Sequence, residues 1–168
     1  MTLGVAATVI VLDQWTKALV LERMTLHESI PIIEDFFSLT YVRNTGAAFG
    51  ILAGKLSASL RVPFFLVTSG LAVGLLIWFL GQVPANRSGI VAACGGVLGG
   101  AVGNMIDRFR LGEVIDFLDV YVGAYHWPTF NVADSAITVG VILLCIDSLR
   151  SEPASTEPGA ATGPDSPE

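Results

Sequence analysis

Long apolar runs separated by polar segments dominate the pattern of the chain. Residues 62–86 contain no charged side chain, and neither do residues 88–106. Each run is long enough to cross a hydrocarbon core of about 30 Å as a helix that rises about 1.5 Å per residue. Apolar segments of similar length lie near the start of the chain and after residue 130. The pattern therefore predicts four membrane helices, at residues 2–21, 62–83, 88–106 and 131–149.

Composition supports this assignment. Of the 168 residues, 52% are hydrophobic and only 14% are charged, whereas a soluble domain carries roughly 25% charged residues. We therefore expect an all-α integral membrane protein. A four-helix domain would occupy residues 1–150, with a small β-rich segment between the first two helices.

The charge is unevenly placed. Residues 151–168 hold four acidic residues, no Lys or Arg, and four of the eight prolines, a composition typical of a disordered acidic tail. Without those four acidic residues the net charge falls from −6 to −2. No basic patch indicates binding to nucleic acid.

The polar segments that separate the helices differ in length. The turn at 84–87 is short, while the segments 22–61 and 107–130 are long and lie together on the other side of the membrane. Within 22–61, residues 36–52 are rich in aromatic and β-branched residues and are broken by glycine. This pattern predicts short strands at the membrane surface.

Several ionisable or amide side chains lie where a membrane helix should be apolar. Asp13 and Lys17 are spaced i, i+4 on one face of the first helix. They form either a self-neutralising pair or a pair that orients a neighbouring site. Asn104, Asp107 and Arg108 share one face at the end of the third helix, where a structural role is the simpler interpretation.

Two aspartates stand out from their apolar surroundings. Asp116 is flanked by Val114, Ile115, Phe117 and Leu118, and Asp134 lies at the start of the fourth helix. A carboxylate at the edge of hydrocarbon is costly and usually has a partner or a function. Only 18 residues separate the two, so a loop that folds back would bring them together.

Two carboxylates about 3 Å apart cannot both ionise, so one keeps a proton. Such a pair suits peptide hydrolysis, because the anion takes a proton from water while the neutral acid polarises the carbonyl group. The alternatives are a small transporter or channel subunit, in which the carboxylates carry protons or cations, and a purely structural scaffold. Neither a zinc-binding H-E-x-x-H pattern nor a G-x-S-x-G motif is present, and we expect no metal or other cofactor.

Four stretches resemble the lipoprotein signal peptidases (signal peptidase II). They are DQWTK (13–17), RNTGAAFG (43–50), GGAVGNMIDRFRLGEVIDF (99–117) and FNVADSAI (130–137). They occur in the family's order and on the predicted helices and connecting segments. Only the acidic tail lies wholly outside the resemblance.

The resemblance implies an intramembrane aspartic endopeptidase that cleaves bacterial prolipoproteins before their diacylglyceryl-modified cysteine. Its two catalytic aspartates correspond to Asp116 and Asp134. The family's other polar positions, which support the site or contact the substrate, correspond here to Asp13, Lys17, Asn44, Asn104, Asp107, Arg108 and Asn131.

The resemblance also implies a multi-pass protein of the bacterial cytoplasmic membrane, in contact with membrane lipids. Both chain ends would be cytoplasmic, and the active site would lie near the extracytoplasmic face. Charge bias predicts the opposite orientation, because the long segments hold six Lys or Arg residues and the other side holds two. Two of the six, Arg43 and Arg108, belong to the motifs, so we follow the resemblance.

Overall fold

The computed structural model describes residues 1–46, 58–84 and 86–150. Its elements follow the order α1 (Thr2–Arg23), β1 (Ser29–Ile33), β2 (Phe37–Asn44), α2 (Ala58–Leu80), α3 (Ser88–Leu111), β3 (Val114–Val122), β4 (Tyr125–His126) and α4 (Val132–Arg150). Four helices are long and apolar enough to span a membrane, which confirms the prediction of a multi-pass membrane protein. The predicted tail at 151–168, and residues 47–57 of the predicted insertion, lie outside the described residues.

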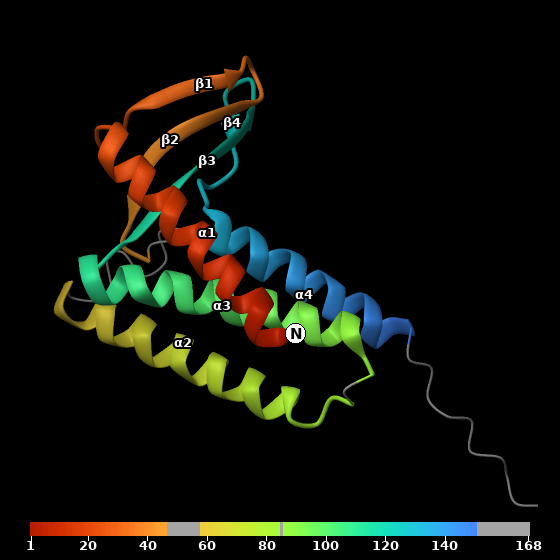
Figure 1. The fold of residues 1–168 in the computed structure, drawn as a ribbon. Coiled ribbons are helices and arrows are strands. Elements are labelled where there is room, and N and C mark those ends of the chain that lie inside the picture. The colour runs from red at the N-terminus through yellow and green to blue at the C-terminus, as the bar shows by residue number, and fades with distance from the viewer. Residues whose placement is uncertain (47–57, 85, 151–168) are drawn as a thin grey trace, which may run out of the picture.

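Helix α3 forms the centre of the bundle, and α1, α2 and α4 pack around it (Figure 1). Small residues make this packing possible on two sides of α3. A Cβ atom on Gly99 would lie 2.7 Å from the carbonyl oxygen of Ala6 in α1, and one on Gly100 would collide with the carbonyl oxygen of Ala133 in α4. The adjacent glycines Gly99 and Gly100 therefore let α1 and α4 approach the backbone of α3 closely.

The glycines of α2 make no such contact. Gly70 and Gly74 are four residues apart, but neither has a described atom from outside its own stretch of helix within 4 Å of the position where a Cβ would stand. In the most apolar stretch of α2, no residue is buried by the rest of the described chain. Helix α2 is thus the least covered of the four helices by the described part of the chain.

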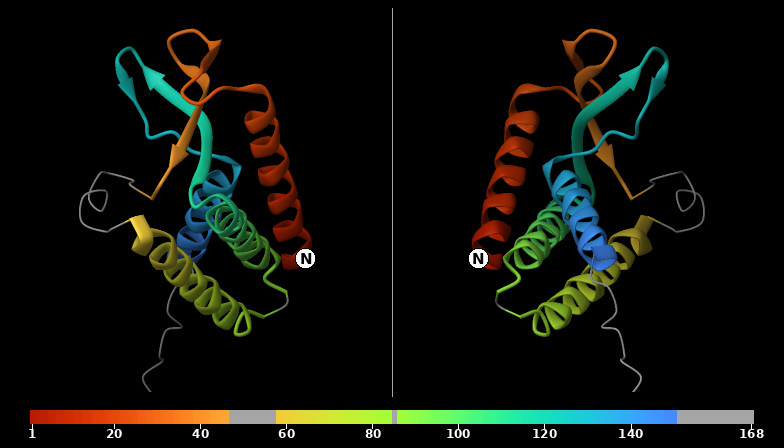
Figure 2. Two further views of the ribbon diagram at one scale, coloured as in Figure 1. Left: turned by 90° about the vertical axis from the view of Figure 1, so that its left-hand side faces the viewer. Right: turned by 90° about the vertical axis from the view of Figure 1, so that its right-hand side faces the viewer.

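The strands form one antiparallel sheet in the order β1-β2-β3-β4. It stands beyond one end of the helices, while the N-terminus, the turn between α2 and α3, and the end of α4 lie at the other (Figures 1 and 2). The sequence placed β structure only between the first two helices, and this was incomplete. Strands β3 and β4 come from the segment between α3 and α4, and β3 pairs with β2 along most of its length.

Helix α3 also continues five residues beyond the predicted end at 106. It stops at Gly112, whose φ of 78° is left-handed and whose N–H group donates to the carbonyl of Arg108 at 3.0 Å. Glycine adopts this conformation without steric cost and commonly ends helices. The longer helix delivers the chain directly into β3.

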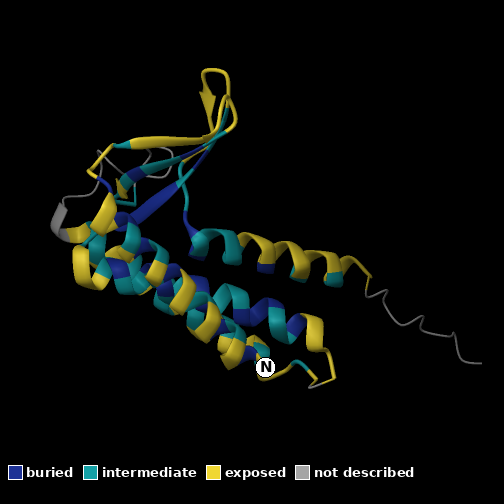
Figure 3. Cartoon of the chain, turned by 45° about the horizontal axis from the view of Figure 1, so that its top comes forward, coloured by how far each residue is buried: buried dark blue, intermediate teal, exposed yellow. Residues whose placement is uncertain are grey.

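Burial is concentrated where the helices meet the sheet (Figure 3). Val20 and Met24 at the end of α1 pack with Tyr41 of β2 and with Ile115 and Phe117 of β3. Strand β1, in contrast, is exposed along its whole length. The apolar cluster fixes β3, and hence Asp116 between Ile115 and Phe117, against the ends of the helices.

Candidate functional site

Asp116 lies in the interior of β3, in the buried region between sheet and helices. Only 1% of its surface is exposed. Its Oδ1 accepts a hydrogen bond from Asn131 Nδ2 at 2.7 Å, and its Oδ2 accepts one from Asn44 Nδ2 at 2.9 Å. Asn44 is in register with Val114, two residues before Asp116, so both side chains lie on the same face of the sheet.

The pKa of Asp116 is raised to about 7, mainly by burial and also by the charge of Asp134. The hydrogen bonds from Asn44 and Asn131 and the charge of Lys17 act in the opposite direction. Burial has the largest effect, because an apolar environment disfavours the charged carboxylate. Asp116 therefore holds its proton up to near-neutral pH.

Asp134 lies in the first turn of α4 and is partly exposed. Its Oδ1 accepts a hydrogen bond from Asn104 Nδ2 at 2.7 Å, and its backbone N–H group donates to Asn131 Oδ1 at 2.9 Å. The second contact makes Asn131 the N-cap of α4, because its side-chain oxygen accepts the N–H group three residues later. The start of α4 is thus fixed by the residue that also contacts Asp116.

Two asparagines connect the aspartates. Asn131 Nδ2 lies 3.2 Å from Asn104 Oδ1 and 2.7 Å from Asp116 Oδ1, while Asn104 Nδ2 donates to Asp134. Asn131 is completely buried. The sequence predicted a loop that folds back between the two aspartates, and in the structure the chain turns back after β3 through β4 to the start of α4. An isolated antiparallel bridge between Leu118 and Phe130 holds this turn just before Asn131.

A buried ionic cluster lies behind the asparagines. Lys17 Nζ is 2.8 Å from both Asp13 Oδ2 and Asp107 Oδ2, and it donates to Asn104 Oδ1 at 3.0 Å. All four side chains are nearly excluded from solvent. Both interpretations of the Asp13 and Lys17 pair hold at once, because the pair is neutralising within α1 and also positions Asn104.

Each carboxylate of this cluster has a second task. Asp13 Oδ1 accepts the N–H group of Ala133 in the first turn of α4 at 3.0 Å, and Asp107 Oδ2 accepts the N–H group of Ile115 in β3 at 3.2 Å. They thereby fix the backbone next to Asp134 and next to Asp116. Gly103 makes room for this arrangement, because a Cβ there would lie 2.7 Å from Asp13 Oδ2.

Gln14 is a member of the cluster that the sequence did not single out. Its Nε2 contacts Asp107 Oδ1 at 2.9 Å, and Asp13 Oδ2 and the carbonyl oxygen of Gly103 at 3.2 Å each. A glutamine between two functional residues gives no signal by itself in a sequence. Only the contact with α3, 93 residues away, shows its position.

Arg108 reaches the site from the end of α3. Its guanidinium lies over the ring of Phe65, 5.0 Å from the centroid, and its charge acts on both Asp116 and Asp134. Arg43, which belongs to the same motif as Asn44, instead points to Tyr41 and Glu113. All nine residues predicted for the site therefore belong to one connected region at the sheet end of the bundle.

The return from β3 to α4 is held by a polar cluster of its own. Asp119 accepts from His126 Nδ1 at 2.9 Å and from Thr40 Oγ1 at 3.0 Å, while the ring of His126 stacks on Tyr121. These contacts join β2, β3 and β4. No three His, Cys, Asp or Glu side chains in the described ranges are grouped so that they could hold a metal ion.

Comparison with known proteins gives consistent results. Residues 5–150 match the profile of the family described as signal peptidase (SPase) II. The chain is 51% identical to the lipoprotein signal peptidase of Syntrophotalea carbinolica over 146 residues, which cover 87% of this chain and 89% of that protein. It is 52% identical to that of Geobacter sulfurreducens over 143 residues, which cover 85% and 88%.

Solved structures agree at the level of the fold. The chain matches a bacterial membrane enzyme determined by the in meso method at 1.9 Å resolution with a TM-score of 0.79 and 35% identity. The match covers 90% of this chain and 94% of that one. A second such enzyme, determined at 2.3 Å, matches with a TM-score of 0.78 and 36% identity.

Proposed function

Because this chain belongs to the signal peptidase II family, we propose that it removes signal peptides from bacterial prolipoproteins with Asp116 and Asp134 as the catalytic pair. The substrate is a precursor whose cysteine carries a diacylglyceryl group, and the bond cleaved lies before that cysteine. The observation that carries the proposal is the connection of the two carboxylates through Asn104 and Asn131. The side chains that hydrogen-bond to the two carboxylates are asparagines, which carry no charge and so hold the pair without neutralising it.

One proton shared by the two carboxylates is sufficient for the reaction. The carboxylate anion takes a proton from water as the water oxygen attacks the scissile carbonyl carbon, and the neutral carboxyl donates its proton to the carbonyl oxygen. The carboxyl that took the proton from water then donates it to the amide nitrogen, while the other carboxylate takes a proton from one hydroxyl of the gem-diol. The carbon–nitrogen bond breaks, and the pair again holds one proton. The raised pKa of Asp116 supports a singly protonated pair near neutral pH, and the apparent pKa values of the reaction belong to the pair.

The remaining polar residues position this chemistry. Lys17 compensates Asp13 and Asp107, whose backbone contacts fix the segments beside the catalytic carboxylates. The positive charge of Arg108 acts on both aspartates. It can therefore attract the carboxylates, or the carbonyl oxygen of a bound substrate, by electrostatic interaction. Asn44 donates a hydrogen bond to one oxygen of Asp116. Asp134 is partly exposed, and its exposed side is where the substrate can approach.

The proposal extends to the location of the protein. We place the protein in the bacterial cytoplasmic membrane, with the sheet and the aspartate pair at the extracytoplasmic face. The opposite end of the bundle, with Arg87 and Arg150, then faces the cytoplasm, against the orientation that the count of basic residues alone favours. Water reaches the pair from the sheet side, and the lipid-modified substrate approaches laterally from the bilayer.

The experiment that tests the function is cleavage of a purified diacylglyceryl-modified precursor. Asp116→Asn and Asp134→Asn should each abolish measurable cleavage, because loss of the acid or the base costs about 10² to 10⁴ in rate and the pair acts as a unit. Asp147→Asn is the matched control, since Asp147 is on the same helix as Asp134 at the other end, and it should cleave normally. Near-normal cleavage by either site variant would refute the assignment, and transport of protons without cleavage would favour a transporter.

A further inference from the structure

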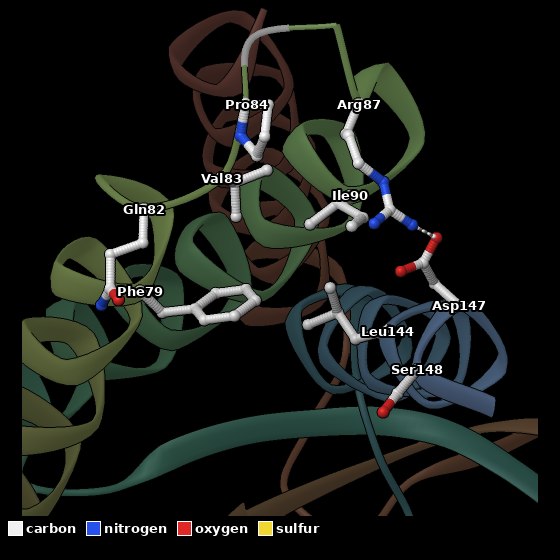
Figure 4. A pocket seen from close by; sticks show the side chains of 9 residues that line it. All are labelled: Phe79, Gln82, Val83, Pro84, Arg87, Ile90, Leu144, Asp147 and Ser148. Carbon is white, nitrogen blue, oxygen red and sulfur yellow. Dashed lines mark hydrogen bonds and ion pairs between the residues drawn. The ribbon is translucent and has the colours of Figure 1, made fainter. Parts of the chain in front are cut away.

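A hollow of about 460 Å³ lies at the end of the bundle opposite the aspartate pair (Figure 4). The end of α2, the start of α3 and the end of α4 surround it. Phe79, Ile90 and Leu144 form apolar walls, and Arg87 and Asp147 pair across its rim. We propose that this hollow binds an anionic phospholipid of the surrounding leaflet, a function separate from peptide cleavage.

The position of the hollow favours a lipid over a soluble ligand. It opens where three membrane-spanning helices end, which is the boundary between hydrocarbon and headgroups. Its walls can accept part of an acyl chain, while Gln82 and Ser148 add polar groups at the same opening. A phospholipid is the molecule that presents a chain and a charged group side by side at this depth.

The charges favour an anionic headgroup. A second hollow of about 210 Å³ shares Ile90 and Asp147 with the first and is lined on its far side by Arg150. Two arginines therefore flank one aspartate at this end of the described chain. Guanidinium groups bind phosphate oxygens in a bidentate manner, and basic pockets between helices bind anionic headgroups.

Arg150 is the cation available for this contact. No hydrogen bond or ion pair joins its guanidinium to another residue in the part of the chain that the structure describes. Arg87 is held by Asp147, and its side chain is still 42% exposed. A phosphate group between the two arginines would compete with Asp147 for hydrogen bonds from Arg87. The same phosphate would accept hydrogen bonds from the guanidinium group of Arg150.

The test is retention of lipid by the full-length protein, measured by native mass spectrometry. The purified protein is incubated with equal amounts of phosphatidylglycerol and phosphatidylcholine of identical acyl chains, so that only the headgroup differs. We expect preferential retention of phosphatidylglycerol, reduced about fivefold by Arg87→Gln and by Arg150→Gln. Asp147→Asn should increase it, because the competing carboxylate is removed. Arg23→Gln at the sheet end is the matched control and should leave the preference unchanged.

Three results would overturn the proposal. Equal retention of phosphatidylglycerol and phosphatidylcholine would show that the hollow does not select an anionic headgroup. An equal loss in Arg23→Gln would show attraction by overall charge. If Asp147→Asn instead raised the KM for a precursor with a basic start, the hollow would be a substrate subsite. Precursor cleavage by each variant separates these outcomes from failure of the proposed peptidase activity, since Arg87 and Arg150 are remote from the aspartates.

Discussion

Replacement of the buried carboxylate at position 116 by an amide should abolish activity and stabilise the fold at the same time. The pKa of Asp116 is raised to about 7, whereas an aspartate in an unfolded chain has a pKa of about 3.9. Between these values the folded protein holds a proton that the unfolded chain has lost. The stability contributed by this proton is fully present below pH 4 and is lost as the pH rises to about 7.

The magnitude follows from that difference. Three pKa units correspond to about 4 kcal/mol, an upper limit because the titration is shared with Asp134. An amide at position 116 offers only one oxygen to the two amide donors, Asn44 Nδ2 and Asn131 Nδ2, so one bond is lost at about 1–2 kcal/mol. Asp116→Asn should therefore be about 2 kcal/mol more stable than the parent at pH 8, and equal to it or less stable at pH 4.

Thermal unfolding in detergent, followed by tryptophan fluorescence at pH 4.5 and pH 8, measures the effect. A gain of about 2 kcal/mol corresponds to a rise in Tm of about 4–8 °C for a chain of this size. The control is Asp119→Asn on the same strand, which keeps only one oxygen for His126 and Thr40, so it loses one hydrogen bond and should be destabilised at both pH values. If the difference in Tm between Asp116→Asn and the parent were the same at pH 4.5 and pH 8, the conclusion that the pKa of Asp116 is raised would be wrong.

Four further outcomes can be measured. Asn44→Ala removes a hydrogen bond that favours the charged form of Asp116, so the high-pH limb of the cleavage profile should move up by about 1 pH unit; a limb that stays in place would exclude this contact from the titration. Lys17→Met leaves two buried carboxylates without their cation and should cost about 3–5 kcal/mol of stability, seen as a lower Tm; an unchanged Tm would contradict the buried ionic cluster. Gly103→Ala should displace Asp13 and lower kcat more than it raises KM, whereas Gly70→Ala, at an open position of α2, should do neither. EDTA should leave cleavage intact, and activity restored only by zinc would indicate a metallopeptidase.

The sequence predicted the parts of the site that are chemically unusual. Asp116 and Asp134 could be singled out because each carboxylate interrupts apolar residues, and their proximity in sequence suggested that they meet. Asn104 and Asn131 were assigned only by resemblance, because an amide near a helix end has many ordinary roles. Their bridging position depends on contacts between α3, β3 and α4 that no local pattern records.

The sheet was predicted less completely than the helices. A membrane helix is recognisable from its own 20 or so apolar residues, so all four were found, with ends within a few residues except for the longer α3. Strand β3 has no such signature, because Val114–Val122 is short and polar residues interrupt it. Its pairing with β2 joins residues at least 70 positions apart, and such pairing is decided by tertiary packing rather than by local sequence.

The hydrogen bond between Asp13 and the N–H group of Ala133 has a consequence for biosynthesis. Its two ends are 120 residues apart, and Asp134 belongs to the fourth of the described membrane-spanning helices, which leaves the ribosome after the other three. Asp13 and Lys17 lie one helical turn apart in α1, so this ion pair needs no other helix to form. The second carboxylate, the capped start of α4 and the bridging asparagine all arrive only at the end. If the two aspartates act as proposed, a chain that ends before α4 holds Asp116 without its partner and should not cleave the precursor.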